Sequence, residues 1–194
     1  SRYSRGEVET LDCAARRRSA MAVAAVFHTD RIQRLPYGRV RLMTEHFGLK
    51  HCLCPCERDY GQEAGAYATA FLVAPNLIVT AAHVLAHLDR RVFVFGFQVQ
   101  EGVARVELAA AQVHEAAEVV GMTLDTVTGA DWAVVRLGRP LAPDVPIPRI
   151  RRQGRVSDGQ ALYVIAHPGG LPTKYTEGGC VRRNEDRSFF AADL

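Results

Sequence analysis

A histidine at the end of an apolar run is the first side chain in this sequence that could do chemistry. His83 follows the stretch 77–80 (Leu-Ile-Val-Thr) and two alanines. Such a run is typical of a β-strand, so the imidazole is expected at a strand end, where small neighbours leave room for a substrate. Histidine is the commonest general base because its ordinary pKa lies near neutral pH. A single histidine is more often structural, so a catalytic role for His83 requires a partner.

Asp131 is the carboxylate that could be this partner. It lies in the segment 129–135 (Gly-Ala-Asp-Trp-Ala-Val-Val), beside a strongly apolar strand. A carboxylate in such a place is expected to be partly buried and to need a polar partner. Paired with a histidine, it would fix the tautomer of the ring and stabilise the protonated form. The alternative is an aspartate that begins a strand after a turn, and the separation of 48 residues does not decide between the two interpretations.

A cluster of possible zinc ligands lies at residues 51–56 (His-Cys-Leu-Cys-Pro-Cys). Thiolates and imidazoles bind zinc, but structural sites use paired cysteines with a second pair elsewhere. Alternate residues of an extended chain point the same way and do not converge on one ion. Free thiols, or a disulfide to Cys13 or Cys180, are the alternatives, and five cysteines cannot all pair within one chain. We predict no metal site and no cofactor.

Two further histidines are interpreted as structural. His167 begins the loop His-Pro-Gly-Gly and has no carboxylate next to it. His87 lies four residues after His83, which on a helix would place both rings on one face. A metal pair of that kind would need a third ligand, which the sequence does not indicate.

Short apolar runs between turns predict the scaffold that positions these residues. The expected strands are residues 66–73, 77–80, 91–99, 103–109, 118–120, 132–137, 161–166, 175–182 and 188–192. Residues 138–160 contain four prolines, which four arginines follow. This segment is expected to form an extended crossing, because proline cannot donate a hydrogen bond to the ladder of a central strand. Many short strands with few helical patterns favour an all-β sandwich or barrel in two groups.

Composition narrows the class of protein. The 194 residues are 48% hydrophobic, which is enough for a sizeable core. A formal net charge of +3 is too mild to indicate a nucleic-acid partner. No apolar run reaches the roughly 18–20 residues of a membrane-spanning helix, so no membrane span is predicted. The arginines at positions 149, 151 and 152 are interpreted by default as a solvated face, with an anionic partner as the alternative.

Segments in a fixed order resemble the trypsin-like serine proteases. Residues 71–83 (F-L-V-A-P-N-L-I-V-T-A-A-H) resemble the strand–turn–strand–histidine signature of that family, and residues 131–137 (D-W-A-V-V-R-L) resemble the segment around its triad aspartate. Residues 161–175 and 189–194 are similar to segments of bacterial V8-like, glutamyl endopeptidase-type enzymes. In those enzymes the first begins the second barrel, and the second runs into the nucleophile loop. A disulfide beside the catalytic histidine, present in trypsin, cannot form here because Val84 follows His83.

This resemblance implies an all-β, chymotrypsin-like double β-barrel in which the second barrel is incomplete. The expected domains are an N-terminal extension (1–20), a first barrel with His83 and Asp131 (21–138), an inter-barrel crossing (139–160) and the start of a second barrel (161–194). By resemblance, His83 is the general base and Asp131 is its orienting partner.

The resemblance also implies a serine nucleophile, which none of the five serines supplies, because none lies in a Gly-x-Ser-Gly context. We expect that serine beyond Leu194, so that the chain is an inactive fragment of a serine endopeptidase with polypeptide substrates. The family suggests a secreted or periplasmic protein. The alternatives are a pseudoprotease that binds other proteins and, third, a zinc-stabilised interaction domain.

Overall fold

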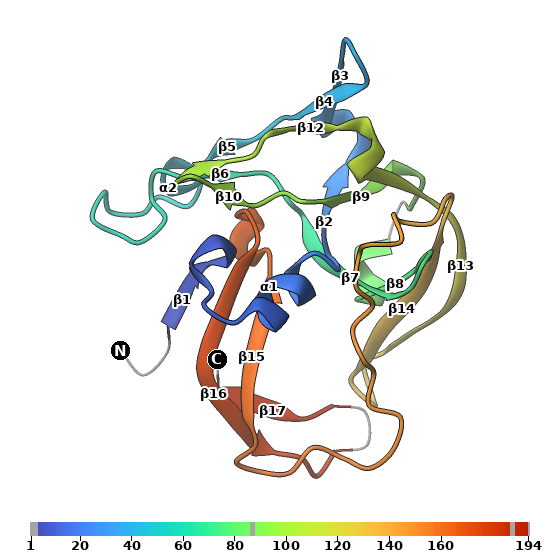
Figure 1. Cartoon of the computed structure of the whole chain (residues 1–194). Helices are drawn as coiled ribbons and strands as arrows, with labels where there is room; N and C mark the ends of the chain where they lie inside the picture. The colour runs from blue at the N-terminus through green and yellow to red at the C-terminus, as the bar shows by residue number, and fades with distance from the viewer. Residues whose placement is uncertain (1–3, 86–87, 187–188, 194) are drawn as a thin grey trace.

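Six antiparallel strands close into a barrel on the right of Figure 1. The computed structural model describes residues 4–85, 88–186 and 189–193. Around the barrel the strands follow the order β13-β14-β8-β7-β2-β9, and β9 pairs again with β13. Their bounds are β2 Val23–His28, β7 Ala68–Ala74, β8 Leu77–Thr80, β9 Arg91–Phe95, β13 Val113–Asp125 and β14 Ala130–Leu137. This barrel confirms the predicted all-β class.

Strand β9 is buried along its length because both of its faces are covered. Successive side chains of a strand point to opposite sides. Phe93 and Phe95 enter the barrel interior, whereas Val92 and Val94 pack in a second core outside it. The outer core lies under a three-stranded sheet in the order β12-β4-β3. The bounds of that sheet are β3 Ile32–Leu35, β4 Arg39–Leu42 and β12 Glu107–Ala109.

The strand predicted over residues 91–99 is interrupted at Gly96. This glycine has φ of +83°, and an added Cβ would lie 2.4 Å from Nε2 of Gln112. The chain therefore turns after Phe95, and Gln112 donates a hydrogen bond to the Phe95 carbonyl. The chain pairs again only at the short hairpin of β10 and β11. The remaining short elements of this half are β5 Glu45–His46, α2 Phe47–Lys50, β6 Glu63–Ala64, β10 Val99–Gln100, β11 Val103–Ala104 and the 3-10 turns η2 Thr29–Arg31, η3 Ala82–Leu85, η4 Leu88–Arg90 and η5 Ala110–Gln112.

A second group of strands forms an open sheet below the barrel in Figure 1. Strand β16 pairs with β15 along one edge and with β1 and β17 along the other. The bounds are β1 Ser4–Glu7, β15 Ala161–Ala166, β16 Lys174–Arg183 and β17 Ala191–Asp193, with η6 Pro168–Gly170 in the loop before β16. Residues 138–160 connect the two groups of strands and form neither helix nor strand.

The N-terminal residues pack on this sheet. After β1 come the 3-10 turn η1 (Val8–Thr10) and the helix α1 (Ala14–Ala20). Val8, Leu11 and Ala20 form a small buried cluster with Ile165 and Tyr175 packed against it. The domain limits predicted at residues 20, 138 and 160 stay a prediction. None of the helices formed by the described residues is long and apolar enough to cross a membrane.

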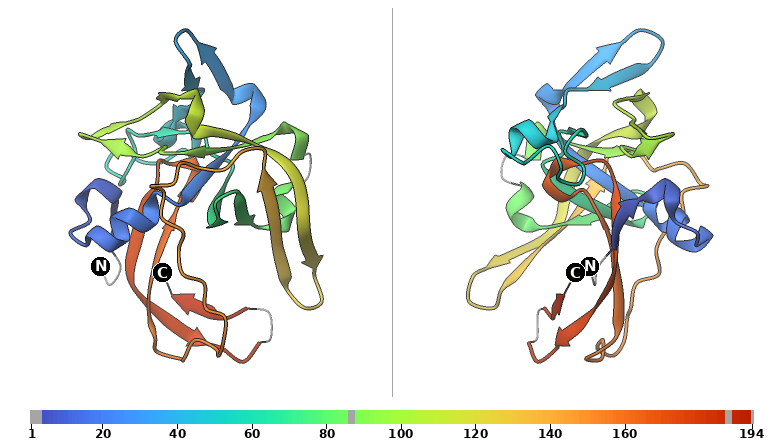
Figure 2. Two further views of the ribbon diagram at one scale, coloured as in Figure 1. Left: turned by 45° about the vertical axis from the view of Figure 1, so that its right-hand side comes forward. Right: turned by 90° about the vertical axis from the view of Figure 1, so that its left-hand side faces the viewer.

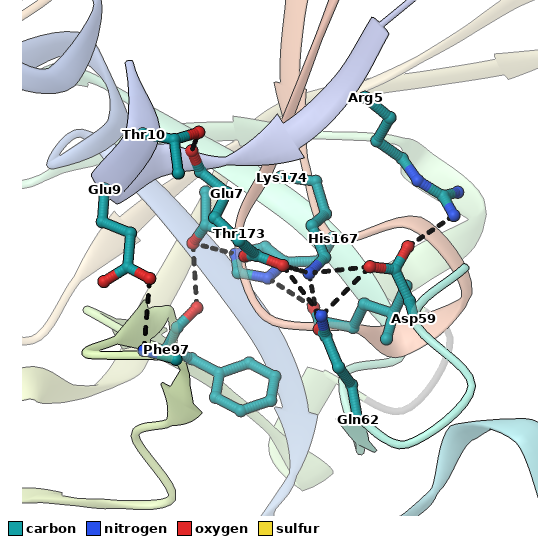
Figure 3. Close-up of polar contacts among 12 residues, drawn as sticks. Arg5, Glu7, Glu9, Thr10, Asp59, Gln62, Phe97, His167, Thr173 and Lys174 are labelled. Carbon is teal, nitrogen blue, oxygen red and sulfur yellow. Dashed lines mark hydrogen bonds and ion pairs between the residues drawn. The ribbon is translucent and has the colours of Figure 1, made fainter. Parts of the chain in front are cut away.

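A buried ion-pair network joins the N-terminal strand, the loop before β6 and the start of β16 (Figure 3). The Lys174 side chain is only 2% exposed, and its ammonium contacts Glu7, Asp59 and Gln62. Arg5 pairs with the same aspartate from β1. A buried charge is tolerated only when it is paired in this way. The network therefore fixes how the open sheet sits against the barrel half of the chain.

Candidate active site

Two neighbouring strands of the closed barrel hold His83 and Asp131. His83 lies in the turn η3, three residues beyond the end of β8, and Asp131 is the second residue of β14. Strands β8 and β14 are antiparallel partners in which Ala133 lies opposite Thr80. Asp131 therefore extends past the end of β8 to the place where the chain turns towards His83. Thr80 also donates a hydrogen bond to the Thr69 carbonyl at 2.9 Å, which fixes β8 on β7.

The two side chains are in direct contact. Nδ1 of His83 lies 2.6 Å from Oδ2 of Asp131. The other carboxylate oxygen, Oδ1, accepts a hydrogen bond from the backbone N–H of His83 at 3.1 Å. Both carboxylate oxygens thus bind the same residue, which fixes the orientation of the ring relative to the carboxylate. The sequence pattern carries no signal for this second, backbone contact, because every residue has an N–H group.

The electrostatics of the pair favour an ionised carboxylate. The pKa of Asp131 is lowered, first because the His83 side chain donates a hydrogen bond to it and further because backbone amides of His83 and Ala82 do so. Partial desolvation acts in the opposite direction. With Asp131 ionised at neutral pH, Nδ1 carries the ring proton and donates a hydrogen bond to Oδ2. The lone pair of a neutral ring is then on Nε2.

The free nitrogen of His83 is open to solvent. The His83 side chain is 60% exposed and that of Asp131 35%. No described side chain forms a hydrogen bond with Nε2. A neutral imidazole with an exposed Nε2, held by a carboxylate through Nδ1, can take a proton from a hydroxyl or a water placed beside it and return the proton later.

No described serine lies at this nitrogen. Ser4 belongs to β1, Ser19 donates a hydrogen bond to the Ala15 carbonyl in α1, and Ser157 lies in the crossing segment. Ser1 and Ser188 lie outside the described residues. Within the part of the chain that the structure describes, the pair of His83 and Asp131 has no hydroxyl or thiol partner.

The other candidates from the sequence lie elsewhere. All five cysteines are free thiols, and those at 52, 54 and 56 are exposed. Among the described residues, no group of three or more histidine, cysteine, aspartate or glutamate side chains is arranged to hold a metal ion. His167 is buried, stacks on Phe97 and bonds the Leu171 carbonyl through Nδ1. His87 lies outside the described residues.

Comparison with known proteins identifies the family and the fold class of this chain. Residues 68–192 match the trypsin-like peptidase domain, and this match includes both β8 with His83 and β14 with Asp131. A search of curated proteins found no match. The fold is similar to a solved structure of a Glu endopeptidase in complex with MPD, with a TM-score of 0.52 and 15% sequence identity over 94% of this chain and 70% of that chain. At this identity the similarity concerns the fold alone, and it confirms the predicted chymotrypsin-like class. Since the family match covers more than half of the residues, the chain belongs to the trypsin-like peptidase domain family.

Proposed function

We propose that His83 is the general base and Asp131 the orienting carboxylate of a serine endopeptidase. The observation that carries this proposal is the 2.6 Å contact between Nδ1 of His83 and Oδ2 of Asp131, with Nε2 left free towards solvent. Membership of a peptidase family supports polypeptides as the substrate class. The resemblance to V8-like enzymes supports a bacterial protein that is secreted or periplasmic.

The proposed reaction uses the pair as a proton carrier. Nε2 of His83 accepts the proton of a serine hydroxyl while the serine oxygen attacks the carbonyl carbon of the scissile peptide. Asp131 stabilises the imidazolium that forms. The same proton then passes from Nε2 to the leaving amine, and a water molecule hydrolyses the acyl-enzyme by the same route. No metal or organic cofactor takes part. The sequence-based interpretation places the serine beyond Leu194, so the product of the complete gene is the form to test.

Labelling of that product with a fluorophosphonate tests the proposal, because this probe reacts only with an activated serine. We expect labelling of the wild type and its near-complete loss in His83→Ala. We expect Asp131→Asn to slow the reaction by about 10⁴-fold, because an asparagine favours the wrong ring tautomer. Asp125→Asn removes a carboxylate from the turn of the same hairpin and should leave labelling unchanged. A folded wild type that is not labelled would contradict the proposal.

That outcome would favour the second candidate, a pseudoprotease that binds other proteins. The observation on its side is that no described hydroxyl or thiol group contacts His83. Sequencing of the labelled peptide separates the two candidates further. In an endopeptidase the label must lie on one serine, and the same serine must stay unlabelled in the His83→Ala variant.

A further inference from the structure

Two arginine-rich segments that are far apart in the sequence line the same surface hollow. Helix α1 contributes Ala15, Arg18 and Ser19, and the inter-barrel crossing contributes residues 146–149 (Pro-Ile-Pro-Arg). The hollow has a volume of about 420 Å³. Both views of Figure 2 show the crossing passing next to α1. No residue of β8 or β14 lines the hollow. This face is therefore separate from the His83 and Asp131 pair.

The face concentrates positive charge. Residues 14–20 contain three arginines and residues 149–155 contain four, and neither segment has an acidic residue. The two segments thus carry +7, whereas the whole chain carries +3, so all other residues together carry −4. Charge separation of this kind produces a local positive potential that a mild net charge conceals.

Four of these arginines have neither an ion pair nor a side-chain hydrogen bond to any described residue. Arg16 pairs with Glu177, Arg17 bonds the Leu11 carbonyl and Arg155 bonds the Asp186 carbonyl. The four others form no ion pair or side-chain hydrogen bond within the described part of the chain, and all are exposed: Arg18, Arg149, Arg151 and Arg152. Arg18 and Arg149 line the hollow, and Arg151 and Arg152 follow directly along the chain. We call these four residues, together with the hollow, the arginine face.

The arginine face also has an apolar component. Ile147 lies in the hollow, is flanked by two prolines and is 43% exposed, and Ile150 is 53% exposed. Proline restricts the backbone, so the spacing of the neighbouring arginines is held with little loss of entropy on binding. Ile147 therefore gives the hollow an apolar wall next to the guanidinium groups of Arg18 and Arg149.

We propose that the arginine face binds an acidic polypeptide segment in which aliphatic side chains alternate with carboxylates. The planar guanidinium forms paired hydrogen bonds to a carboxylate, which the ammonium of lysine cannot do. A hollow can accept a single aliphatic side chain of a polypeptide. The flat surface of a bilayer does not have a shape complementary to a hollow. The lining of the hollow contains no aromatic side chain on which successive bases could stack, which disfavours single-stranded nucleic acid.

A fluorescent peptide in which glutamates alternate with leucines is the probe for this face. We expect the 194-residue chain to bind it at low salt, with affinity that falls as salt is added, because exposed charge pairs are screened. The same peptide with glutamine in place of glutamate should not bind. The double variant Arg149→Gln/Arg152→Gln should weaken binding about tenfold, since each exposed pair contributes up to about a fivefold effect.

A matched control removes the same charge elsewhere. Arg34 and Arg58 are also exposed and without an ion-pair partner among the described residues, and neither lies on the arginine face. Arg34→Gln/Arg58→Gln should bind the peptide as the wild type does, and urea unfolding checks that both double variants are folded. Equal weakening in both variants, or tighter binding of phosphatidylglycerol vesicles or of a single-stranded oligonucleotide than of the peptide, would overturn the proposal.

Discussion

Acidification should destabilise the chain well before its carboxylates are protonated, through two buried histidines. His167 is 4% exposed and His114 is 3% exposed. Burial lowers the pKa of each ring to about 4, and the charges of Lys174 near the first and Arg139 near the second act in the same direction. Nδ1 of His114 has no hydrogen-bond partner among the described residues. Both rings are therefore neutral in the folded chain at neutral pH.

The sign of the effect follows from proton binding. In the unfolded chain a histidine has a pKa of about 6.5, so between pH 6.5 and 4 the unfolded state binds more protons than the folded state. Stability is then full above about pH 6.5 and falls as the pH decreases, until both states are protonated below about pH 4. A difference of about 2.5 pKa units corresponds to about 3 kcal/mol for each histidine. The two together approach the whole stability of a typical domain, about 5–15 kcal/mol.

Urea unfolding followed by the fluorescence of Trp132 measures this dependence. Between about pH 6 and 5, where few carboxylates titrate, we expect the free energy of unfolding to fall by about 2.5 kcal/mol per pH unit. The double variant His114→Gln/His167→Asn should lose at least half of this slope. His28, whose pKa is also lowered by burial, retains its effect in that variant. Ile78→Val shortens a fully buried side chain of the barrel core, so it lowers stability without removing a titrating group and should keep the slope. An unchanged slope in the double histidine variant would refute the reasoning.

Three further substitutions test the packing of the core and the contact between the barrel half and the open sheet, by the same urea unfolding assay. Lys174→Met leaves Glu7 without its cation and leaves Asp59 with Arg5 alone, and it should cost about 3–5 kcal/mol; a cost below about 1 kcal/mol would contradict a buried ion pair. Gly170→Ala should cost more than about 3 kcal/mol, because φ is +86° and the new Cβ would lie 2.6 Å from a backbone oxygen, whereas Gly154→Ala, at φ +67° in open space, should cost about 1 kcal/mol. Phe27→Ala empties a fully buried site under the outer sheet and should cost about 3–5 kcal/mol.

The strands next to the candidate site could be predicted because their signals are local. Strand β8 has the predicted bounds, and β14 begins only two residues earlier than expected. In both, a run of β-branched and aliphatic residues lies between turn residues, so neighbours in the sequence carry the information. The contact of His83 with Asp131 is different. It depends on the register of β8 against β14, and only the resemblance to a family predicted it.

The N-terminal elements could not be predicted for a physical reason. The segment of α1 (Ala-Ala-Arg-Arg-Arg-Ser-Ala) has no apolar stripe of its own, and residues 1–19 were therefore expected to be a polar extension. The N-terminal elements are held in place by contacts with residues about 160 positions later, such as the packing of Val8 near Ile165 and the ion pair of Glu7 with Lys174. Sequence periodicity reports only which face a segment buries. It does not identify the partner of a few isolated apolar or charged residues.

The closed barrel sets the geometry of the His83 and Asp131 pair without a contribution from the open sheet. Strands β8 and β14 pair within a barrel that has no free edge. The serine of the proposed reaction belongs to neither strand, so we expect the rate of labelling to depend also on the contact between the barrel and the open sheet. At this junction the backbone N–H of His167 donates to Oγ1 of Thr69 at 2.9 Å.

Thr69→Val removes that acceptor and leaves a buried N–H unpaired, at a cost of about 1–3 kcal/mol. In the product of the complete gene we expect slower fluorophosphonate labelling. The NMR signal of the His83 Nδ1 proton, which reports the hydrogen bond to Asp131, should persist in the same variant. Loss of both readouts together would show that the barrel alone does not hold the pair. Loss of neither would show that this junction contact does not position the nucleophile.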